Sequence, residues 1–562
     1  MADRSRPRSS KKDAPTGQPT SRITIYLNGR KRSIPSGRSL SSALSEEHIP
    51  VLVRSLKYHR PRGQYCGTGQ CAGCLVRHNG VPMARACQIV PEDGDVVETE
   101  SGWPSTEHDL LSLMDRVFSQ KMDTLRGFTR PLVLRRPYLK VVRSFSGLGA
   151  MPDTAPKKSP SMEQKTVDLL IVGGGATGRA AEQAVIEGSI RQRVHLSDRR
   201  VAGESVVYLG PSEDKGFLAL VSRKGLPALQ VTSRKVLLAT GSYDAGLFFP
   251  GSDLPGVLTG EGLESLAGEQ GVHPFQSIVV FGGGPRTRRL VKRFGSRVKL
   301  LAAPTTLSED LRQLARSLEI EVVERSMILS AQGRNRLRSV LLRDRKTGEQ
   351  RRVRAGALVL AHRVLPNATL LFQAGAVMQW REGGSAYFPE LSPRCETTVP
   401  GLFAVGSAAG FLDPTSSLES ARCAAETLAG GGQSGKNASS QSSSDPAGLL
   451  AKRVPQEDNG FMLEYLTEFL RLPRTRKTVL CPCEDVTLEE VEGVVKEGWD
   501  PTLEVVKRLT GTGMGLCQGR YCVPDSILLL SALTGRSPEA IGFMTQRPPV
   551  WPLRIGDLAG GR

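Results

Sequence analysis

A short alternation of apolar and polar residues opens the patterned part of the chain. The apolar positions are Ile23, Ile25 and Leu27. This two-residue period predicts a β-strand, and Asn28-Gly29 directly after it is typical of a tight hairpin turn. Ser39 then predicts the N-cap of a short helix. Strand, hairpin and helix ahead of a cysteine-rich loop indicate a β-grasp unit, which we expect over residues 22–105.

Apolar strands alternate with helical patterns over a long central region, 166–430. This order predicts an α/β core. Val167–Val172 and Ser277–Phe281 are apolar strands that each run into a glycine-rich turn, so we expect two dinucleotide-binding (Rossmann-like) folds, the second over about 275–365.

The last region, 477–562, has a helical pattern. Thr487 and Glu490 form a capping-box pair ahead of an apolar stripe, Gly498 can end that helix, and a second helix is expected over 502–509. The remaining segments read as a disordered basic tail (1–21), a connector (106–165) with a flexible spacer at Pro152–Ser161, and a Ser/Gly-rich linker (431–476). The predicted fold class is multidomain, α/β and α+β.

Composition narrows the function classes. The chain has 562 residues, a formal net charge of +19 and ten cysteines. No stretch approaches the roughly 20 apolar residues of a membrane span, and Met1–Arg22 has no apolar signal region, so a cytoplasmic location is expected. The cysteines then indicate reduced thiols available for metal. The basic residues are spread along the chain without a nucleic-acid-binding motif, which favours a basic surface, suited to an acidic protein partner, over nucleic-acid binding.

The first cysteine group has the spacing C-x4-C-x2-C with a fourth cysteine downstream. Its members are Cys66, Cys71, Cys74 and Cys87. This is the plant-type [2Fe-2S] ligand pattern. Glycines between the cysteines let the loop fold around a cluster, and nearby arginines could offset its negative charge; these are Arg60, Arg62, Arg77 and Arg85. Zinc and redox-inert thiols are the alternatives, but zinc usually takes two short cysteine pairs.

The second cysteine group combines C-x-C with C-x4-C, separated by the two predicted helices. Its members are Cys481, Cys483, Cys517 and Cys522. Four thiolates in this arrangement suit a [2Fe-2S] cluster or a zinc ion. Cys395 and Cys423 are isolated in the sequence, and we interpret both as buried structural cysteines.

The first glycine-rich turn reads Gly173-x-Gly175-x-x-Gly178 between a strand and an Ala-rich helix. There the glycines allow a tight turn and the close approach of a pyrophosphate. Asp198, after the next strand, is either the ribose ligand or a surface carboxylate. Two nested dinucleotide folds are the layout of two-dinucleotide flavoprotein reductases. Two further landmarks of that layout are Thr240-Gly241 and Gly406-Ser407, each after an apolar strand.

The second turn reads Gly282-x-Gly284-x-x-Thr287, with threonine in place of the third glycine. A run of cations follows; they are Arg286, Arg288, Arg289, Lys292 and Arg293. They either bind a phosphorylated cofactor or form a basic helix face.

Three strings carry a resemblance to a known family. They are Lys57-Tyr-His-Arg-Pro-Arg-Gly63, Phe249-Pro-Gly-Ser-Asp-Leu-Pro-Gly-Val257 and Gly513-Met-Gly-Leu-Cys-Gln-Gly-Arg-Tyr-Cys522. With the motifs above, the chain resembles heterotetrameric sarcosine oxidase alpha subunits and the A-type subunits of opine oxidases, hydrogen cyanide synthase and dye-linked proline or hydroxyproline dehydrogenases.

The resemblance implies a pyridine nucleotide-disulfide reductase-type core and a C-terminal [2Fe-2S] domain of the bacterioferritin-associated-ferredoxin (BFD) type. It implies two [2Fe-2S] clusters, FAD or NAD(P) in the core and FMN at a subunit interface. It also implies a separate amino-acid-oxidase-like flavoprotein subunit that oxidises a secondary amine or amino acid, while this chain relays electrons to an acceptor that the sequence does not identify.

The chain departs from the family pattern at two places. It is short between Asp198 and Val236, without the usual Gly-Gly segment, and Ser407 stands where an aspartate is usual. No catalytic acid–base group is predicted. Two rival hypotheses therefore stay open: a self-contained NAD(P)H-dependent flavin/iron–sulfur reductase, and a non-enzymatic iron–sulfur electron carrier with a degenerate dinucleotide core.

Overall fold

A computed structural model describes residues 21–117, 162–187, 193–196, 203–213, 216–223, 226–429, 446–454, 461–473, 477–551 and 553. The predicted tail up to residue 20, the predicted spacer at Pro152–Ser161 and Asp198 lie outside the described residues. Among the described residues, no helix has the length and apolar character needed to cross a membrane.

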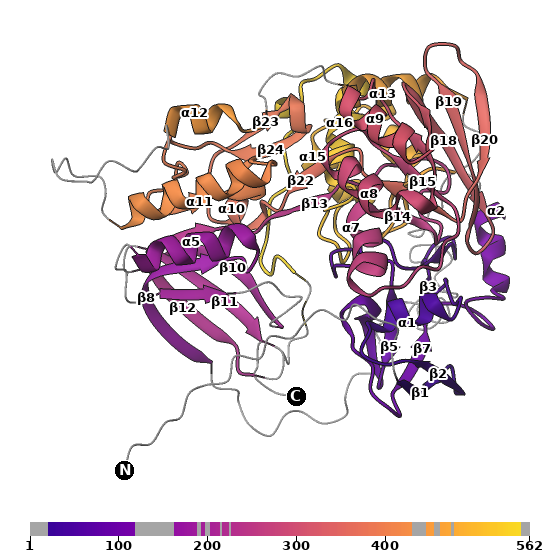
Figure 1. Cartoon of the computed structure of the whole chain (residues 1–562), viewed down its shortest axis with the longest axis horizontal. Helices are drawn as coiled ribbons and strands as arrows, with labels where there is room; N and C mark the ends of the chain where they lie inside the picture. The colour runs from indigo at the N-terminus through magenta and orange to yellow at the C-terminus, as the bar shows by residue number, and fades with distance from the viewer. Residues whose placement is uncertain are drawn as a thin grey trace.

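The N-terminal unit is a five-stranded sheet with one short helix packed against it, and it forms the lower right of Figure 1. Its elements are β1 (Arg22–Leu27), β2 (Arg30–Pro35), α1 (Leu40–Glu46), β5 (Leu75–His78), β6 (Val81–Arg85) and β7 (Val96–Thr99). The strand order is β2-β1-β7-β5-β6. The predicted hairpin turn has left-handed backbone at Asn28 and Gly29, and the Ser39 side chain accepts a hydrogen bond from the Ser42 amide, as an N-cap does.

The first dinucleotide fold is built on one sheet that is parallel on one side and antiparallel on the other, and it forms the lower left of Figure 1. Its elements are β8 (Glu163–Val172), α5 (Ala176–Glu187), β9 (Arg193–Leu196), β10 (Glu204–Ser212), β11 (Gly216–Arg223), β12 (Leu229–Leu238) and β25 (Leu402–Ala404). Strands β9, β8, β12 and β25 run parallel, and β10–β12 form an antiparallel meander. The short stretch after β9 therefore contains this meander.

The second dinucleotide fold is a parallel five-stranded sheet of order β14-β21-β15-β16-β17. Its elements are β14 (Val257–Thr259), β15 (Ile278–Phe281), α8 (Pro285–Phe294), β16 (Val298–Ala302), α9 (Glu309–Ser317), β17 (Glu321–Val323) and β21 (Ala357–Leu360). An antiparallel sheet is inserted before β21; its strands are β18 (Ser326–Gly333), β19 (Leu337–Asp344) and β20 (Gln350–Arg354).

The N-terminal unit also contains the short strand pair β3 (Val53–Arg54) and β4 (Pro61–Arg62). The remaining elements of the core are β13 (Ser242–Asp244), α7 (Gly260–Leu263), β22 (Val364–Pro366), α10 (Thr369–Gln373), β23 (Met378–Arg381), β24 (Ala386–Pro389), α11 (Pro414–Leu428) and α12 (Pro446–Ala451). Among these, α11 packs against α5 of the first fold.

The C-terminal region is helical and shares one hydrophobic core with the second dinucleotide fold. Its elements are α13 (Phe461–Arg471), β26 (Val479–Cys481), β27 (Val486–Thr487), α14 (Leu488–Lys496), α15 (Leu503–Thr510), α16 (Val523–Thr534) and α17 (Pro538–Ile541). Both hydrogen bonds of the predicted capping box are present at Thr487 and Glu490. The predicted multidomain α/β and α+β class is confirmed.

The structure places two further sets of predicted residues. Cys395 and Cys423 are buried as expected, and their side chains contact each other in the hydrophobic core of the first fold. Of the four arginines expected to offset a cluster's charge, three are neutralised by carboxylates. Arg60 and Arg62 pair with Asp253, and Arg77 pairs with Glu98 and Glu100.

Candidate site for redox cofactors

The first cysteine loop is closed and lined with amide groups. Its four cysteines are buried, none more than 8% exposed. The Cys66 Sγ accepts hydrogen bonds from the amides of Thr68 (3.5 Å) and Cys71 (3.4 Å), and the Cys71 Sγ accepts one from the Gly73 amide (3.4 Å). Amides directed at sulfur stabilise thiolate charge. Gly67 and Gly69 have left-handed backbone, which glycine adopts without strain.

The thiols of this loop are arranged in two pairs. Cys66 contacts Cys71, and Cys74 contacts Cys87. Two pairs suit a centre with two irons, each held by two thiolates, better than a zinc ion held by four.

The second cysteine group has the same paired character. Cys481 contacts Cys522 and Cys483 contacts Cys517, so each pair joins the β26 hairpin to the loop before α16. The hydrogen bond from Cys483 lowers the pKa of the Cys517 thiol to about 6. A thiol that ionises this readily suits a metal ligand, and the four cysteines fit a second cluster.

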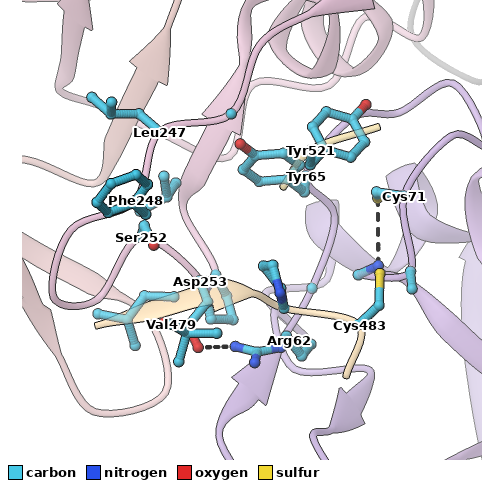
Figure 2. A pocket seen from close by; sticks show the side chains of 18 of the residues that line it. Arg62, Tyr65, Cys71, Leu247, Phe248, Ser252, Asp253, Val479, Cys483 and Tyr521 are labelled. Carbon is cyan, nitrogen blue, oxygen red and sulfur yellow. Dashed lines mark hydrogen bonds and ion pairs between the residues drawn. The ribbon is translucent and has the colours of Figure 1, made fainter. Parts of the chain in front are cut away.

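The two cysteine groups face each other across one cavity of about 70 Å³. Cys71 of the first group and Cys483 of the second both line it (Figure 2). Tyr65 and Tyr521 meet there edge to face, with their ring centroids 5.3 Å apart. Burial raises the pKa of both phenols well above its usual value, which keeps them neutral.

Arg85 joins the two cysteine loops directly. Its Nε donates to the main-chain oxygen of Cys71 and its Nη2 donates to that of Leu516, each at 3.2 Å. Within the described part of the chain, no carboxylate forms an ion pair with Arg85. Of the four arginines near the first loop, it therefore supplies the positive charge that a cluster would meet.

Burial and charge fix the N-terminal unit against the core on the other side of this cavity. Asp253 pairs with both Arg60 (2.6 Å) and Arg62, as the dashed line from Arg62 in Figure 2 shows, while Arg62 also pairs with Asp485 (2.9 Å). Burial opposes the ionisation of Asp253, but the two guanidinium groups outweigh it and lower its pKa well below its ordinary value.

The first glycine-rich turn lines a second cavity of about 230 Å³. Gly173, Gly175, Thr240 and Gly241 all border it, as predicted for a dinucleotide pocket. A Cβ on Gly175 would have no atom within 4 Å, so the approach to this glycine is open, whereas a Cβ on Gly178 would lie 1.7 Å from the Gly173 oxygen. Gly178 is thus required for the close packing of α5 on β8.

Three residues of this pocket were not predicted from the sequence. Gln70 belongs to the first cysteine loop, Arg520 to the second, and Trp551 to the C-terminal segment. Arg520 stacks on the Trp551 ring at 3.3 Å, and burial lowers its pKa to about 10. The Gln70 Oε1 and Arg520 Nε atoms are buried without a hydrogen-bond partner in the described structure, which suits a polar ligand in the pocket. The sequence offered one signal for Gln70 and Arg520, because each lies between two predicted cysteine ligands.

The other predicted dinucleotide residues are more dispersed. Gly406 lies beside Thr177 of α5 and accepts no larger residue, since a Cβ there would lie 2.9 Å from the threonine side chain; Ser407 follows it in a short helical turn. Gly282 and Gly284 belong to the second fold. Thr287, in the third glycine position, is buried and donates to the Ala361 oxygen (3.0 Å), so the turn closes without a glycine there.

The cations after the second turn are largely engaged by the chain itself. Arg286 pairs with Asp244 (2.9 Å) and Glu264 (2.9 Å), Arg289 pairs with Glu264, and Arg288 pairs with Asp310. Burial raises the pKa of Asp244 to about 6, although Arg286 opposes this. These ion pairs favour the interpretation of α8 as a basic helix face over that of a phosphate site.

Comparison with known proteins matches three segments of the chain to families. Residues 20–102 match the 2Fe-2S iron-sulfur cluster binding domain, residues 214–427 the pyridine nucleotide-disulphide oxidoreductases, and residues 475–562 the sarcosine oxidase A3 domain. Together with the fold, these matches define an oxidoreductase with an iron–sulfur domain and a dinucleotide-binding core.

Curated relatives give the family more closely. The chain is 24% identical to the sarcosine oxidase alpha subunit of Rhizobium meliloti over 96% of its own length, although it spans only 58% of that protein. It is 25% identical to the opine oxidase A-type subunit of Agrobacterium tumefaciens (70% of this chain, 91% of that one). Over 86 residues it is 40% identical to the HcnA subunit of hydrogen cyanide synthase from Pseudomonas aeruginosa, covering 82% of it. The chain belongs to this family of oxidase A-type subunits.

A solved structure shows a similar fold over most of the chain. L-proline dehydrogenase from P. horikoshii aligns with a TM-score of 0.63 over 96% of this chain and 97% of that one, at 18% identity.

Proposed function

We propose that this chain is the electron-relay subunit of a heteromeric, flavin-dependent amine or amino-acid dehydrogenase or oxidase. Its partner would be an amino-acid-oxidase-like flavoprotein that oxidises a secondary amine of the sarcosine, opine, proline or hydroxyproline type. The family membership and the names of the relatives support this class of substrate and a multisubunit assembly.

One observation carries the proposal: both cysteine loops contribute residues to the same two cavities. Gln70 of the first cysteine loop and Arg520 of the second both border the pocket of Gly173 and Gly175, while Cys71 and Cys483 border the cavity between the two loops. Centres held by these loops would exchange electrons inside one chain.

In this proposal the first cluster is held by Cys66, Cys71, Cys74 and Cys87, and the second by Cys481, Cys483, Cys517 and Cys522. Each cluster, when bound, carries one electron at a time, which divides a two-electron oxidation into single steps. The protein's own contribution is to hold the thiolates in pairs, to direct amides at the Cys66 and Cys71 sulfurs, and to place the Arg85 charge between the loops.

The dinucleotide of the proposal, FAD or NAD(P), lies at Gly173, Gly175, Thr240 and Gly241. The glycines would admit the pyrophosphate at the N-terminus of α5, and the stacked pair of Arg520 and Trp551 would contribute to the wall of the same pocket. FMN at the interface with the partner subunit remains part of the proposal.

The test is expression of the chain alone and together with the flavoprotein encoded beside it, followed by assays of sarcosine, proline, hydroxyproline and opines with an artificial electron acceptor. We expect turnover only in the complex. Turnover of any amine by the lone chain would refute the relay assignment, and NADH-driven dye reduction by the lone chain would favour a self-contained reductase instead.

A further inference from the structure

A wide cleft separates the N-terminal unit from the second dinucleotide fold. Its volume is about 680 Å³, within the range of roughly 300–1,000 Å³ that is usual for small-molecule sites. The wall from the N-terminal unit includes Ser45, His48 and Gln64, and the opposite wall comes from the second fold and the β18–β20 sheet.

The cleft lies at the end of the second fold that does not bind dinucleotides. Gly256, Ser277 and Gly356, which border it, directly precede β14, β15 and β21. The cleft therefore lies at the amino ends of these parallel strands, whereas dinucleotides bind beyond the carboxyl ends. A ligand here would occupy a site separate from both glycine-rich turns.

The charge of the cleft is one-sided. Four cations border it, namely Lys299, Arg336, Arg338 and Arg354, and none of the described aspartates and glutamates does. None of the four forms an ion pair with another described residue. Two arginines of β20 differ in this respect. Arg351 forms an ion pair with Glu321, whereas Arg354 has no such partner within the described ranges. Four like charges around one cleft repel each other unless an anion lies between them.

The inner wall adds a buried polar group. Gln64 is 8% exposed, and both its Nε2 and its Oε1 are buried without a hydrogen-bond partner among the described residues. A buried amide offers two donors and one acceptor, and leaving them unpaired is costly. The remaining wall is apolar, contributed by Leu258, Leu266, Phe275 and Leu337.

We propose that this cleft binds a small, phosphate-bearing anion of the nucleoside polyphosphate class. The four cations would contact the phosphates, the apolar wall would accept the flat base, and the Gln64 amide would pair with a polar edge of that base, as glutamine pairs with adenine elsewhere. The proposal does not rest on the relay function, because none of its contacts is to a cysteine or to the Gly173 turn, although Gln64 and Pro255 also line the cavity between the cysteine groups.

The experiment is isothermal titration of the full-length chain with ATP and, separately, with inorganic tripolyphosphate. The test variant is Arg336→Glu/Arg338→Glu, and the matched control is Lys31→Glu/Arg32→Glu, which makes the same charge change at two exposed cations of β2. We expect the test variant to bind ATP at least about tenfold more weakly and the control to bind as the native chain does.

Two further titrations identify what is recognised and where. If the Gln64 amide contacts the base, Gln64→Leu should weaken the binding of ATP but leave the binding of tripolyphosphate unchanged. Gly175→Val should leave the affinity of the cleft for both ligands unchanged. Equal ATP affinity in the native chain and in Arg336→Glu/Arg338→Glu would overturn the proposal, as would the absence of ATP and tripolyphosphate binding to the native chain. Should the double glutamate variant melt below the native chain, Arg336→Gln/Arg338→Gln replaces it with the same expectation.

Discussion

Tyr65 and Tyr521 meet edge to face with their ring centroids 5.3 Å apart, and each is the sequence neighbour of a cysteine from a different cysteine group, Cys66 and Cys522. The contact thus joins two loops separated by more than four hundred residues in the sequence. It places an apolar, neutral pair of rings between two centres that would each carry negative charge, in the cavity that Cys71 and Cys483 border.

Arg85→Met should lower the reduction potentials of both clusters. Its guanidinium bonds to both cysteine loops, and a positive charge stabilises the reduced, more negative state of a neighbouring cluster. A redox titration followed by EPR measures both potentials. Arg77→Met is the control, because it removes the same charge from a residue whose bonds in the described structure go to Gly80, Glu98 and Glu100 and not to either cysteine loop, and it should change both potentials less than Arg85→Met does. A change in only one potential would contradict a shared role for Arg85.

Cys71→Ser and Cys517→Ser should each remove one iron–sulfur signal and leave the other. Each cysteine belongs to a different set of four thiols, and a set of three rarely holds such a cluster. Iron content per chain and the EPR spectrum of the reduced protein check this. Cys395→Ser is the control, since Cys395 pairs with Cys423, away from both groups. An unchanged iron content in Cys71→Ser would remove the basis for the first cluster.

Gly175→Val should abolish dinucleotide binding, because its side chain would enter the open approach to the pyrophosphate position. Gly284→Val makes the same change in the second turn, where a Cβ also meets no neighbour, and it should retain the nucleotide. Nucleotide released on denaturation, measured by chromatography, compares the two variants. Loss in the Gly284 variant alone would place the dinucleotide in the second fold.

Asp253→Asn should destabilise the chain by about 3–5 kcal/mol, because it leaves the buried charges of Arg60 and Arg62 without their shared partner. Thermal unfolding at pH 7 measures the loss. An asparagine variant that unfolds at the native temperature would show that this pair contributes little.

The same carboxylate predicts a pH dependence. The pKa of Asp253 is lower in the folded chain than in the unfolded chain, so its contribution is complete above a pH of about 4 and decreases as the pH falls below it. The native chain should therefore lose more stability on acidification than Asp253→Asn does. Parallel acid-dependent curves for the two proteins would contradict this.

Much of the architecture could be predicted because local signals agreed with it. The Asn28-Gly29 turn, the Ser39 cap and the Thr487–Glu490 capping box each depend on residues close in sequence. The cysteine spacings likewise indicated which thiols gather, since short loops limit where they can lie.

What the sequence could not reveal depends on packing between distant segments. Nothing near Arg85 in the sequence indicates its contact with Leu516, and nothing near Gln70 indicates Trp551. Cys395 and Cys423 come into contact only when α11 packs into the first fold. The same limit applied to Arg60 and Arg62, whose partner Asp253 lies nearly two hundred residues away. We predicted that their charge would offset that of a cluster. In the structure it pairs with Asp253 instead and joins the N-terminal unit to the core.

In the proposed function, electrons from an amine pass through both cysteine groups of this chain. The decisive experiment is to freeze the complex of this chain and its flavoprotein partner anaerobically after amine addition and to record its EPR spectrum. We expect two reduced [2Fe-2S] signals in the complex, none in the lone chain mixed with the same amine, and one in a complex carrying Cys517→Ser. Clusters that stay oxidised in a complex that nevertheless turns over the amine would contradict it.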